Sequence, residues 1–462
     1  MADKLMTGAK ASILDAVGGT PIVKLNKVGN HTRANLYVKC EYMNPGGSMK
    51  DRIGINIVNL AEKMGQLKPG GTIVEATSGN TGMGLALVAA VRGYKAVFVM
   101  PDKQSEEKRQ ALRSVGAKVV ICPTDVEPDD PRSYYCVSRR IAEETPNAFY
   151  ANQYHNPANP ESHYLSTGPE LWEQTAGELD VFVSGMGTGG TLSGTGKFLK
   201  EKKPAVKIVG VDPIGSLYYD LYKTGRMTKA HPYKVEGIGE DFVPSTMNLK
   251  ILDDVVQVTD RECFMTARDL IRKEGILIGG SAGAAVAGAV KYAEMSGKRE
   301  NIVVLLPDSS SRYLSKFLND DWMRENGFLG PETSAGKVRD ILARRKDPEV
   351  ITADANEAVG VVVERLKSRG ISQVPVLEAG KLMGIVNEVD ILKHLVGGAA
   401  NMKTPVRDIA EDNFATVAPE SSVAFLSDHF NRGKVVIVMD GTRLAGVITK
   451  IDLIDHLAGM LG

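Results

Sequence analysis

Six short runs of apolar, mostly β-branched residues recur between residues 36 and 306. They read TIVEA, AVFVM, KVVICP, VFVSG, KIVGVDP and NIVVLLP, and helical patterns separate them. Buried strands that alternate with amphipathic helices are typical of open, mostly parallel α/β sheets. Because ligands bind at the carboxyl ends of strands in such sheets, the segments beyond these runs are where we expect the chemistry.

Four segments rich in small residues lead into predicted helices. They are NPGGSMKDR at 44–52, EATSGNTG at 75–82, SGMGTGGT at 184–191 and IGGSAG at 278–283. One glycine turn of this kind would carry little information. Four of them along one such chain predict a single composite site at the carboxyl edge of the sheet.

Lys50 lies in the first turn of a predicted helix. The positive end of the helix dipole disfavours its charged form and would lower the pKa of the amine, which leaves it free to form a Schiff base. The alternative is a solvated surface lysine, which is the commoner situation for a lysine taken alone.

The other segments suggest anion binding. Segment 75–82 brings hydroxyls and backbone N–H groups to a helix N-terminus, where it binds a carboxylate or serves as a plain N-cap. Segment 184–191 has the glycines and hydroxyls of a phosphate cup. It lacks the lysine of a nucleotide-binding P-loop and the GxGxxG spacing of dinucleotide sites, so a phosphomonoester fits better.

The C-terminal third contains an internal repeat. VRDI at 338–341 recurs at 406–409, and GIVNEVDIL at 384–392 is matched by GVITKIDLI at 446–454. A duplicated unit predicts two copies packed together in one β-α-β module. We therefore expect a first domain over 1–330, a turn-rich linker over 331–336, and repeats over 337–398 and 402–462.

Composition excludes several classes of partner. With 56 basic and 56 acidic residues, the chain has no net charge to attract nucleic acid or an anionic membrane. Its four cysteines form no CxxC pair and show no metal-ligand spacing, which favours reduced thiols in a cytoplasmic protein without a metal. The N-terminus does not read as a secretion signal, and the apolar stretch 275–290 is shorter than a membrane span and predicts a buried helix.

The four segments in this order resemble the fold type II pyridoxal-phosphate enzymes, and the resemblance spans residues 12–328. It implies a fold of two open, mostly parallel α/β sheets. It also implies that Lys50 is the Schiff-base lysine and that Asn80 contacts the ring oxygen of the cofactor. It further implies that Ser281 takes the pyridine nitrogen. The phosphate would be held by Gly187, Thr188, Gly189, Gly190 and Thr191, and the substrate carboxylate by Thr77, Ser78, Thr81 and Gln153.

The serine at position 281 has a chemical consequence under this resemblance. A neutral hydroxyl does not hold a proton on the ring nitrogen, so the ring is a weaker electron sink than one paired with an aspartate. Elimination at the β-carbon then competes well with transamination.

Within this family, VEGIGEDFVP at 235–244, FLNDDWM at 317–323 and the C-terminal repeat resemble the cystathionine β-synthases. That implies condensation of L-serine with L-homocysteine to L-cystathionine and water, with hydrogen sulfide as a further product. Gly237 and Glu240 would then contact substrate. Glu240 stands where animal enzymes have a tyrosine; it either meets the ammonium of homocysteine or faces solvent.

Two other functions stay open. One is a cysteine synthase that uses O-acetylserine or O-phosphoserine with sulfide and carries a regulatory module. The other is an adenosyl-ligand sensor with an inactive enzyme half, which the intact lysine and cofactor segments argue against. The resemblance also implies no haem, because the catalytic pattern begins within the first fifteen residues, and no CxxC redox switch stands near 203–206.

The repeat resembles a CBS-domain pair, which binds adenosyl ligands through an aspartate at a helix start. Thr449 and Asp452 keep this pattern in the second repeat, whereas Asp390 in the first repeat lacks the preceding hydroxyl. S-adenosylmethionine is therefore the expected effector, and a pure scaffolding role is the alternative. The resemblance implies a homodimer or a homotetramer.

Overall fold

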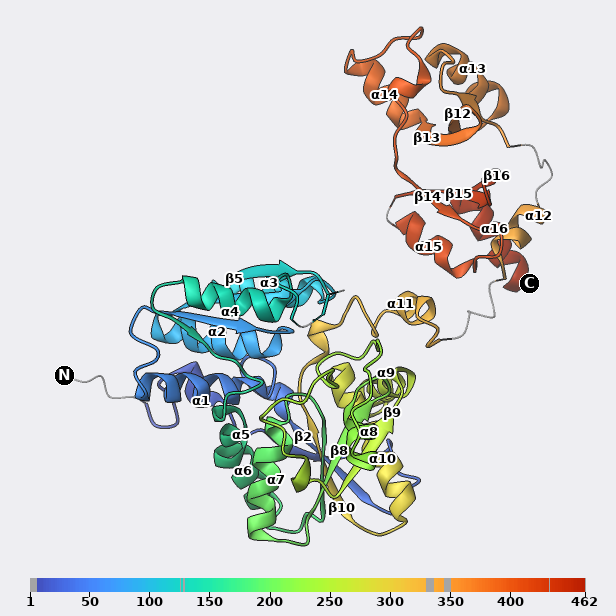
Figure 1. Ribbon diagram of the computed structural model, residues 1–462. Helices are drawn as coiled ribbons and strands as arrows, with labels where there is room; N and C mark the ends of the chain where they lie inside the picture. The colour runs from blue at the N-terminus through green and yellow to red at the C-terminus, as the bar shows by residue number, and fades with distance from the viewer. Residues whose placement is uncertain are drawn as a thin grey trace. The chain divides into compact units, whose positions relative to one another are not determined.

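The structure is a computed structural model that describes residues 6–124, 126–127, 129–329, 336–344, 350–431 and 433–461. Its contacts divide the chain into two compact units, Met1–Phe328 and Leu329–Gly462 (Figure 1). Most of the predicted linker, residues 331–335, lies outside the described ranges. We describe each unit by itself.

The first unit contains two open sheets. The larger has the order β1-β2-β10-β7-β8-β9, in which only β1 runs antiparallel to its neighbour. The smaller has the order β5-β4-β3-β6 and is entirely parallel. The strands are β1 (Ile22–Lys24), β2 (Asn35–Cys40), β3 (Thr72–Ala76), β4 (Lys95–Pro101), β5 (Lys118–Cys122), β6 (Ala148–Tyr150), β7 (Val181–Gly185), β8 (Lys207–Pro213), β9 (Asp254–Val258) and β10 (Asn301–Leu306).

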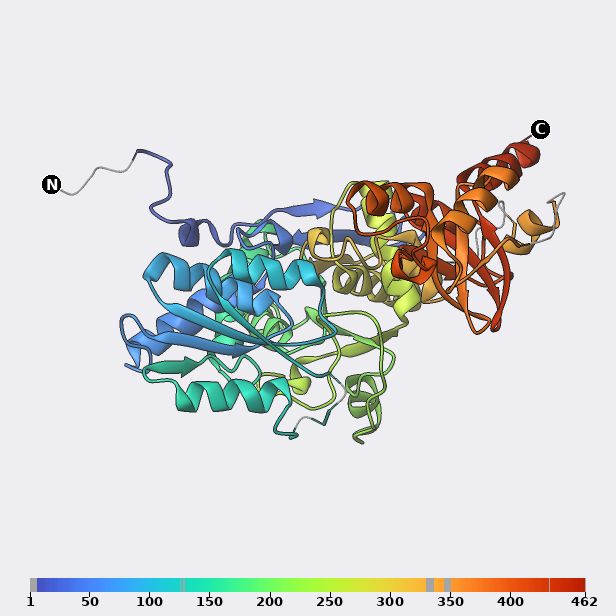
Figure 2. The ribbon, with the colours of Figure 1, turned by 90° about the horizontal axis from the view of Figure 1, so that it is seen from above.

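This architecture confirms the predicted pair of mostly parallel α/β sheets, and each of the six apolar runs forms a strand. Helices cover the sheets, as the two views of Figures 1 and 2 show. They are α1 (Lys50–Lys63), α2 (Asn80–Arg92), α3 (Glu106–Ser114), α4 (Tyr134–Glu144), α5 (Ala158–Ser162), α6 (Gly168–Gln174), α7 (Gly190–Lys202), α8 (Tyr218–Thr224), α9 (Asp260–Asp269), α10 (Gly280–Ser296) and α11 (Asp320–Glu325), with the π-helical turns η3 (His163–Thr167) and η5 (Leu270–Glu274) and the 3-10 turns η1 (Ile13–Ala16), η2 (Glu41–Met43), η4 (Leu249–Ile251) and η6 (Ser310–Arg312).

The apolar stretch 275–290 behaves as predicted. Most of it forms α10, whose residues from Gly280 to Ala289 are all buried. Within the described ranges, every helix is too short or too polar to cross a membrane.

Helices α1 and α2 pack at unusually close range because glycine occupies the contact. A Cβ on Gly84 of α2 would overlap the backbone carbonyl of Lys50, and one on Gly54 of α1 would overlap the backbone of Gly84. Only glycine allows such an approach. The start of α1 is thereby held against α2.

Buried charges fix the same end of α1. Arg52 donates from Nε to Glu41 Oε2 at 2.7 Å and from Nη1 to Glu170 Oε1 at 2.7 Å. Lys39 donates to Glu170 Oε2 at 2.9 Å. Burial alone would raise the pKa of Glu170, but Arg52 and Lys39 lower it to about 2. Breaking one member of such a buried network would leave an uncompensated charge, so the network resists displacement of α1.

The second unit confirms the duplicated module. Each repeat has a three-stranded sheet, β11-β12-β13 or β14-β15-β16, followed by a helix. The elements are α12 (Val338–Ala343), β11 (Ala353–Asp354), α13 (Val359–Arg369), β12 (Gln373–Glu378), β13 (Lys381–Asn387), α14 (Glu388–Val396), η7 (Val406–Asp408), β14 (Phe414–Val417), α15 (Ala424–Asn431), β15 (Val435–Asp440), β16 (Arg443–Ile448) and α16 (Lys450–Leu461).

The two repeats exchange their leading segments. Val338 and Ile341 of α12 are buried in the core of the second repeat, while Val406 and Ile409 around η7 are buried in the core of the first. Neither repeat therefore completes its apolar core without the other.

Candidate active site

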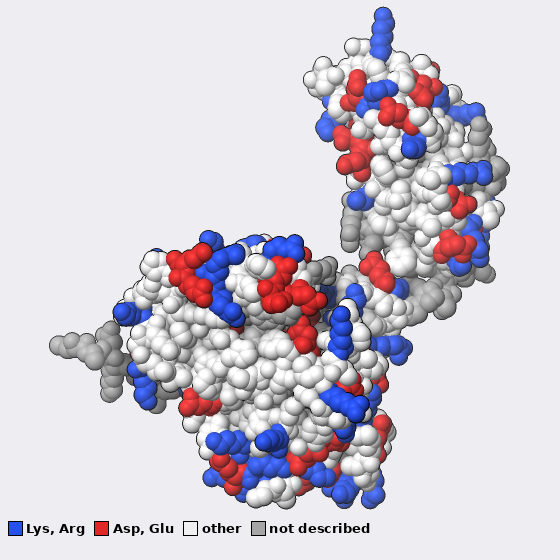
Figure 3. Space-filling model, viewed as in Figure 1, with Lys and Arg blue, Asp and Glu red and all other residues white. Residues whose placement is uncertain are grey.

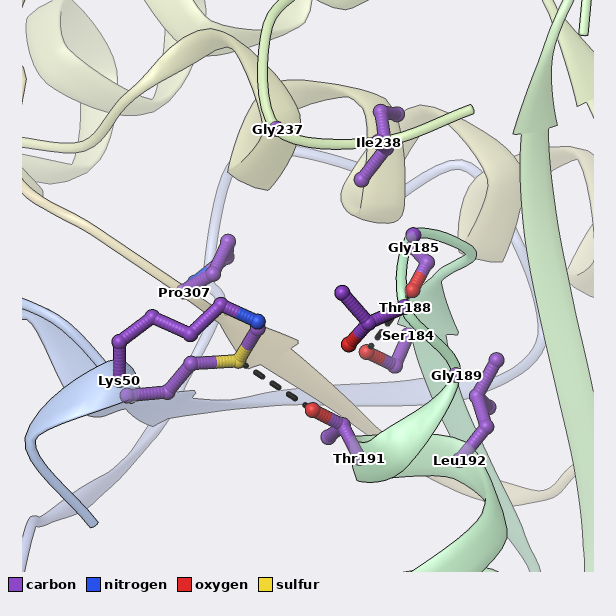
Figure 4. Close-up of a pocket in the computed structure, with 12 residues that line it drawn as sticks. Lys50, Ser184, Gly185, Thr188, Gly189, Thr191, Leu192, Gly237, Ile238 and Pro307 are labelled. Carbon is purple, nitrogen blue, oxygen red and sulfur yellow. Dashed lines mark hydrogen bonds between the residues drawn. The ribbon is translucent and has the colours of Figure 1, made fainter. Parts of the chain in front are cut away.

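Lys50 lines a small cavity, which Figure 4 shows. The other walls come from the turn after β7 with the start of α7, from the loop at 237–238, and from Pro307 just beyond β10. The structure thus brings several predicted site residues into one place at the carboxyl ends of β7 and β10. These are Lys50, Gly187, Thr188, Gly189, Thr191 and Gly237.

The turn between β7 and α7 is shaped by glycine. Gly189 has a φ of +84°, which glycine adopts without strain, and a Cβ there would lie 2.5 Å from Met247 Cα. A Cβ on Gly187 would lie 3.1 Å from the carbonyl oxygen of Gly237. The bare backbone thus forms a cradle at the N-terminus of a 13-residue helix, where the helix dipole favours an anion.

Lys50 is the first residue of α1, as predicted, and its pKa is lowered to about 8. Burial is the main cause, whereas Glu240, Asp308 and Glu75 act in the opposite direction. The dipole argument from sequence therefore gave the right direction, but desolvation is the physical reason. The charged form of Lys50 still predominates at neutral pH, but the uncharged fraction is far larger than for a lysine with an ordinary pKa.

Two of the carboxyl groups near Lys50 are themselves perturbed. Burial raises the pKa of Glu75, in strand β3, to about 8. Burial and the neighbouring Asp241 raise the pKa of Glu240 to about 8. Both carboxyl groups are largely protonated at neutral pH, and in their charged forms they favour the charged form of Lys50.

Asn80 begins α2, and its amide is bonded at both ends. Its Nδ2 donates to Asp308 Oδ2 at 2.8 Å, and its Oδ1 accepts from Arg312. Tyr313 donates to the same Asp308 oxygen at 2.6 Å. Asp308, Arg312 and Tyr313 were not among the residues predicted from the sequence. Their signal was their place just after the strand NIVVLL, at the sheet edge where the site was expected.

Ser281 is buried in the first turn of α10, and its hydroxyl faces the loop that closes the cavity. A Cβ on Gly237 would lie 3.9 Å from Ser281 Oγ. Gly190, the remaining member of the predicted phosphate cup, begins α7 beside the cavity and faces Asn159 instead.

The predicted carboxylate loop has internal partners. Thr77 Oγ1 accepts the N–H groups of Gly79 at 2.9 Å and Gly82 at 3.1 Å, and so caps the start of α2. Thr81 donates to Gln153 Oε1 at 2.6 Å. Thr81 and Gln153, far apart in sequence, are therefore neighbours, and half-buried Ser78 lies in the same loop.

The predicted effector residues occupy helix N-termini. Asp452 Oδ2 accepts from the backbone N–H and the hydroxyl of Thr449, at 2.7 and 2.8 Å. Asp390 accepts from the Asn387 N–H at 3.3 Å, and its own N–H donates to Asn387 Oδ1 at 2.9 Å. Both aspartates thus take part in helix capping. Within the described part of the chain, no group of three or more His, Cys, Asp or Glu side chains is placed to bind a metal ion.

Residues 13–308 match the family described as pyridoxal-phosphate dependent enzyme. The chain belongs to this pyridoxal-phosphate dependent family. Residues 338–397 and 406–459 each match the CBS domain, so this family member carries a CBS pair.

Similar proteins cover nearly the whole chain. Cystathionine beta-synthase of Dictyostelium discoideum is 38% identical over 96% of this chain and 92% of that protein. The Saccharomyces cerevisiae protein of the same name is 35% identical over 97% and 98%. A solved structure of a hydrogen sulfide-producing enzyme from Fusobacterium nucleatum is 36% identical, with a TM-score of 0.61, and covers 66% of this chain and 98% of that one.

The pKa of Lys50 predicts its reactivity. In the cofactor-free enzyme, reductive methylation of Lys50 should rise with pH and level off above about 8, because the uncharged amine is the nucleophile. Free Nα-acetyllysine, with an ordinary pKa of about 10.4, should keep gaining reactivity to higher pH. Mass spectrometry of the Lys50 peptide measures the effect, and a profile parallel to that of the free amino acid would contradict it.

Proposed function

We propose that the chain condenses L-serine with L-homocysteine to give L-cystathionine and water. The observation that carries this proposal is a partly deprotonated Lys50 facing a glycine cradle, in a chain that matches cystathionine beta-synthases over almost its full length. The reaction contributes to transsulfuration and cysteine biosynthesis. Its substrates are small amino acids.

The residues present fit pyridoxal phosphate. Lys50 offers the amine, and Gly187, Thr188, Gly189 and Thr191 offer a cradle for a phosphate at a helix N-terminus. When bound, the cofactor supplies an electron-withdrawing ring that acidifies the α-proton of the attached amino acid. We assign Asn80, Ser281 and Gly190 to the cofactor as well, and Thr77, Ser78, Thr81, Gln153 and Gly237 to the substrate.

Lys50 is the group that moves protons. Burial leaves its amine uncharged in part near neutral pH, so it can remove the α-proton of serine and later return it. Thr81 and Gln153, already in contact, lie where the helix N-terminus of α2 favours the substrate carboxylate. Their role is to orient serine relative to Lys50.

A second candidate function is sulfide-dependent cysteine synthesis from O-acetylserine or O-phosphoserine. The matched hydrogen sulfide-producing enzyme favours sulfur chemistry with a small thiol. The CBS pair and the near full-length match to cystathionine beta-synthases favour the first proposal.

We propose further that the enzyme binds no haem, is cytoplasmic and forms a homodimer or homotetramer. On the face drawn in Figure 3, acidic and basic side chains are interspersed rather than gathered by sign. A mixed surface of this kind supports amino-acid substrates over nucleic acid or an anionic membrane.

Product analysis tests the reaction. The purified holoenzyme should convert serine and homocysteine to cystathionine, and the Lys50→Ala variant should lose at least about a thousandfold in kcat, because acid–base and covalent roles coincide in this residue. Mass spectrometry of the products measures this. Faster formation of cysteine from O-acetylserine and sulfide would instead establish the second function.

Glu240 is proposed to meet the ammonium of homocysteine. The Glu240→Gln variant should raise the KM for homocysteine roughly fivefold, as loss of a partly exposed ion pair does, with little change in the KM for serine. Because the pKa of Glu240 is about 8, the charged fraction of its carboxyl group grows as the pH rises through that value. The difference in homocysteine KM between the wild-type enzyme and Glu240→Gln should grow with it. Glu173→Gln, at an exposed carboxylate of α6 that does not contribute to the Glu240 pKa, is the matched control. An unchanged homocysteine KM would remove this role.

S-adenosylmethionine is proposed as the effector, bound near Thr449 and Asp452. At a hundredfold excess over its Kd, it should stabilise the folded protein by about 2.7 kcal/mol, which a thermal shift detects. Both variants should keep the fold, because asparagine also caps helices. Asp452→Asn should abolish the ligand-induced thermal shift, whereas Asp390→Asn should keep it. No shift at millimolar ligand would favour the scaffolding role.

A further inference from the structure

A second row of side chains lies directly behind the cradle. It comes from α5 and the π-helical turn η3, which pack on α7 at glycine positions. A Cβ on Gly190 would overlap the side chain of Asn159, and one on Gly194 would overlap the carbonyl of Pro160. These two glycines, four residues apart on one face of α7, allow α5 to approach the helix closely.

This close approach delivers two buried donors to the hydroxyls of the cradle. Asn159 Nδ2 lies 3.0 Å from Thr188 Oγ1, and His163 Nε2 lies 3.2 Å from Thr191 Oγ1. Asn159 and His163 are four residues apart and fully buried. Thr188 and Thr191 both line the cavity that contains Lys50.

The hydrogen bonds of Asn159 set the direction in which it donates. Its Nδ2 also donates to the carbonyl of Gln153 at 2.9 Å, so the nitrogen, not the oxygen, faces Thr188. Reversal of the amide would lose the bond to the Gln153 carbonyl, which can only accept. Thr188 Oγ1 therefore accepts from Asn159, which leaves the Thr188 proton for another acceptor.

His163 acts in the same way on Thr191. Burial, with the charges of Lys50 and Arg52, lowers the pKa of His163 well below its usual range, so the ring is neutral and has one donor and one acceptor nitrogen. Thr191 directs its own proton to Met49 Sδ at 3.4 Å (Figure 4). His163 Nδ1 lies 2.9 Å from the Thr167 hydroxyl, and the tautomer with its proton on Nε2 donates to Thr191 and accepts from Thr167.

We propose that Asn159 and His163 are positioning residues that hold the oxygens of Thr188 and Thr191, so that both hydroxyl protons point at the phosphate of the cofactor. The thioether of Met49 is a weak hydrogen-bond acceptor. A phosphate oxygen would replace it as the acceptor of the Thr191 hydroxyl, and the bond between Thr191 and His163 would stay in place. The inference rests on the phosphate lying in the cradle, as proposed above.

Cofactor titration of the apoenzyme tests the proposal without reference to catalysis. His163→Leu should weaken the binding of pyridoxal 5′-phosphate by about tenfold or more, which is the usual contribution of one hydrogen bond to a charged group, here from Thr191 to the phosphate. The affinity for pyridoxal, which lacks the phosphate, should stay unchanged. His163→Gln, which can keep a donor nitrogen near Nε2, should restore most of the affinity. Asn159→Asp, which replaces the donor by an acceptor of the same shape, should show the same phosphate-selective loss. Fluorescence titration gives both dissociation constants for each variant.

A ¹⁵N spectrum of the histidines gives an independent readout. With pyridoxal phosphate bound, the ring of His163 should carry its proton on Nε2. Equal loss of affinity for pyridoxal and its phosphate, failure of His163→Gln to recover, or a proton on Nδ1 would overturn the proposal. These results concern cofactor affinity alone, so they are separable from the identity of the product, which the serine and homocysteine assay decides.

Discussion

The lowered pKa of Lys50 depends on burial of this residue at the first position of α1, and contacts within the first unit keep it there. Gly84 lets α2 press against the Lys50 carbonyl, and Arg52 ties the same turn to Glu41 and Glu170. A shift of α1 toward solvent would raise the pKa of Lys50 toward its ordinary value, because desolvation is the main cause of its lowered pKa. The glycine contacts and buried ion pairs thus help to keep the pKa of Lys50 low.

The cradle facing Lys50 follows the same logic of close backbone approach. Glycine at 187 and 189 brings bare N–H groups to the cavity, while glycine at 190 and 194 brings α5 against α7. The first pair lines the cavity. The second pair places Asn159 and His163 behind it, where they set the direction of the hydroxyls. One short glycine-rich stretch therefore serves both the inner and the outer layer of the site.

Much of the fold was predictable, because the strands of parallel sheets are buried on both faces and their sequences are continuous apolar runs. VFVSG and NIVVLL form β7 and β10, and the segments that follow them line the cavity. Asp308 and Arg312 escaped prediction although they follow β10, since a lone aspartate or arginine carries no local pattern. His163 and Asn159 escaped because buried polar residues on a short helix are recognisable only by what they touch.

The sequence by itself determined the open α/β class of the first unit, the duplicated C-terminal module and the family. Local patterns suffice for these because period, glycine spacing and repetition are properties of consecutive residues. Only the tertiary structure decided that burial lowers the pKa of Lys50, that Asn80 is held by Asp308 and Arg312, and that the two repeats exchange their leading segments. Desolvation and long-range contacts depend on which distant segments meet, and no local pattern states that.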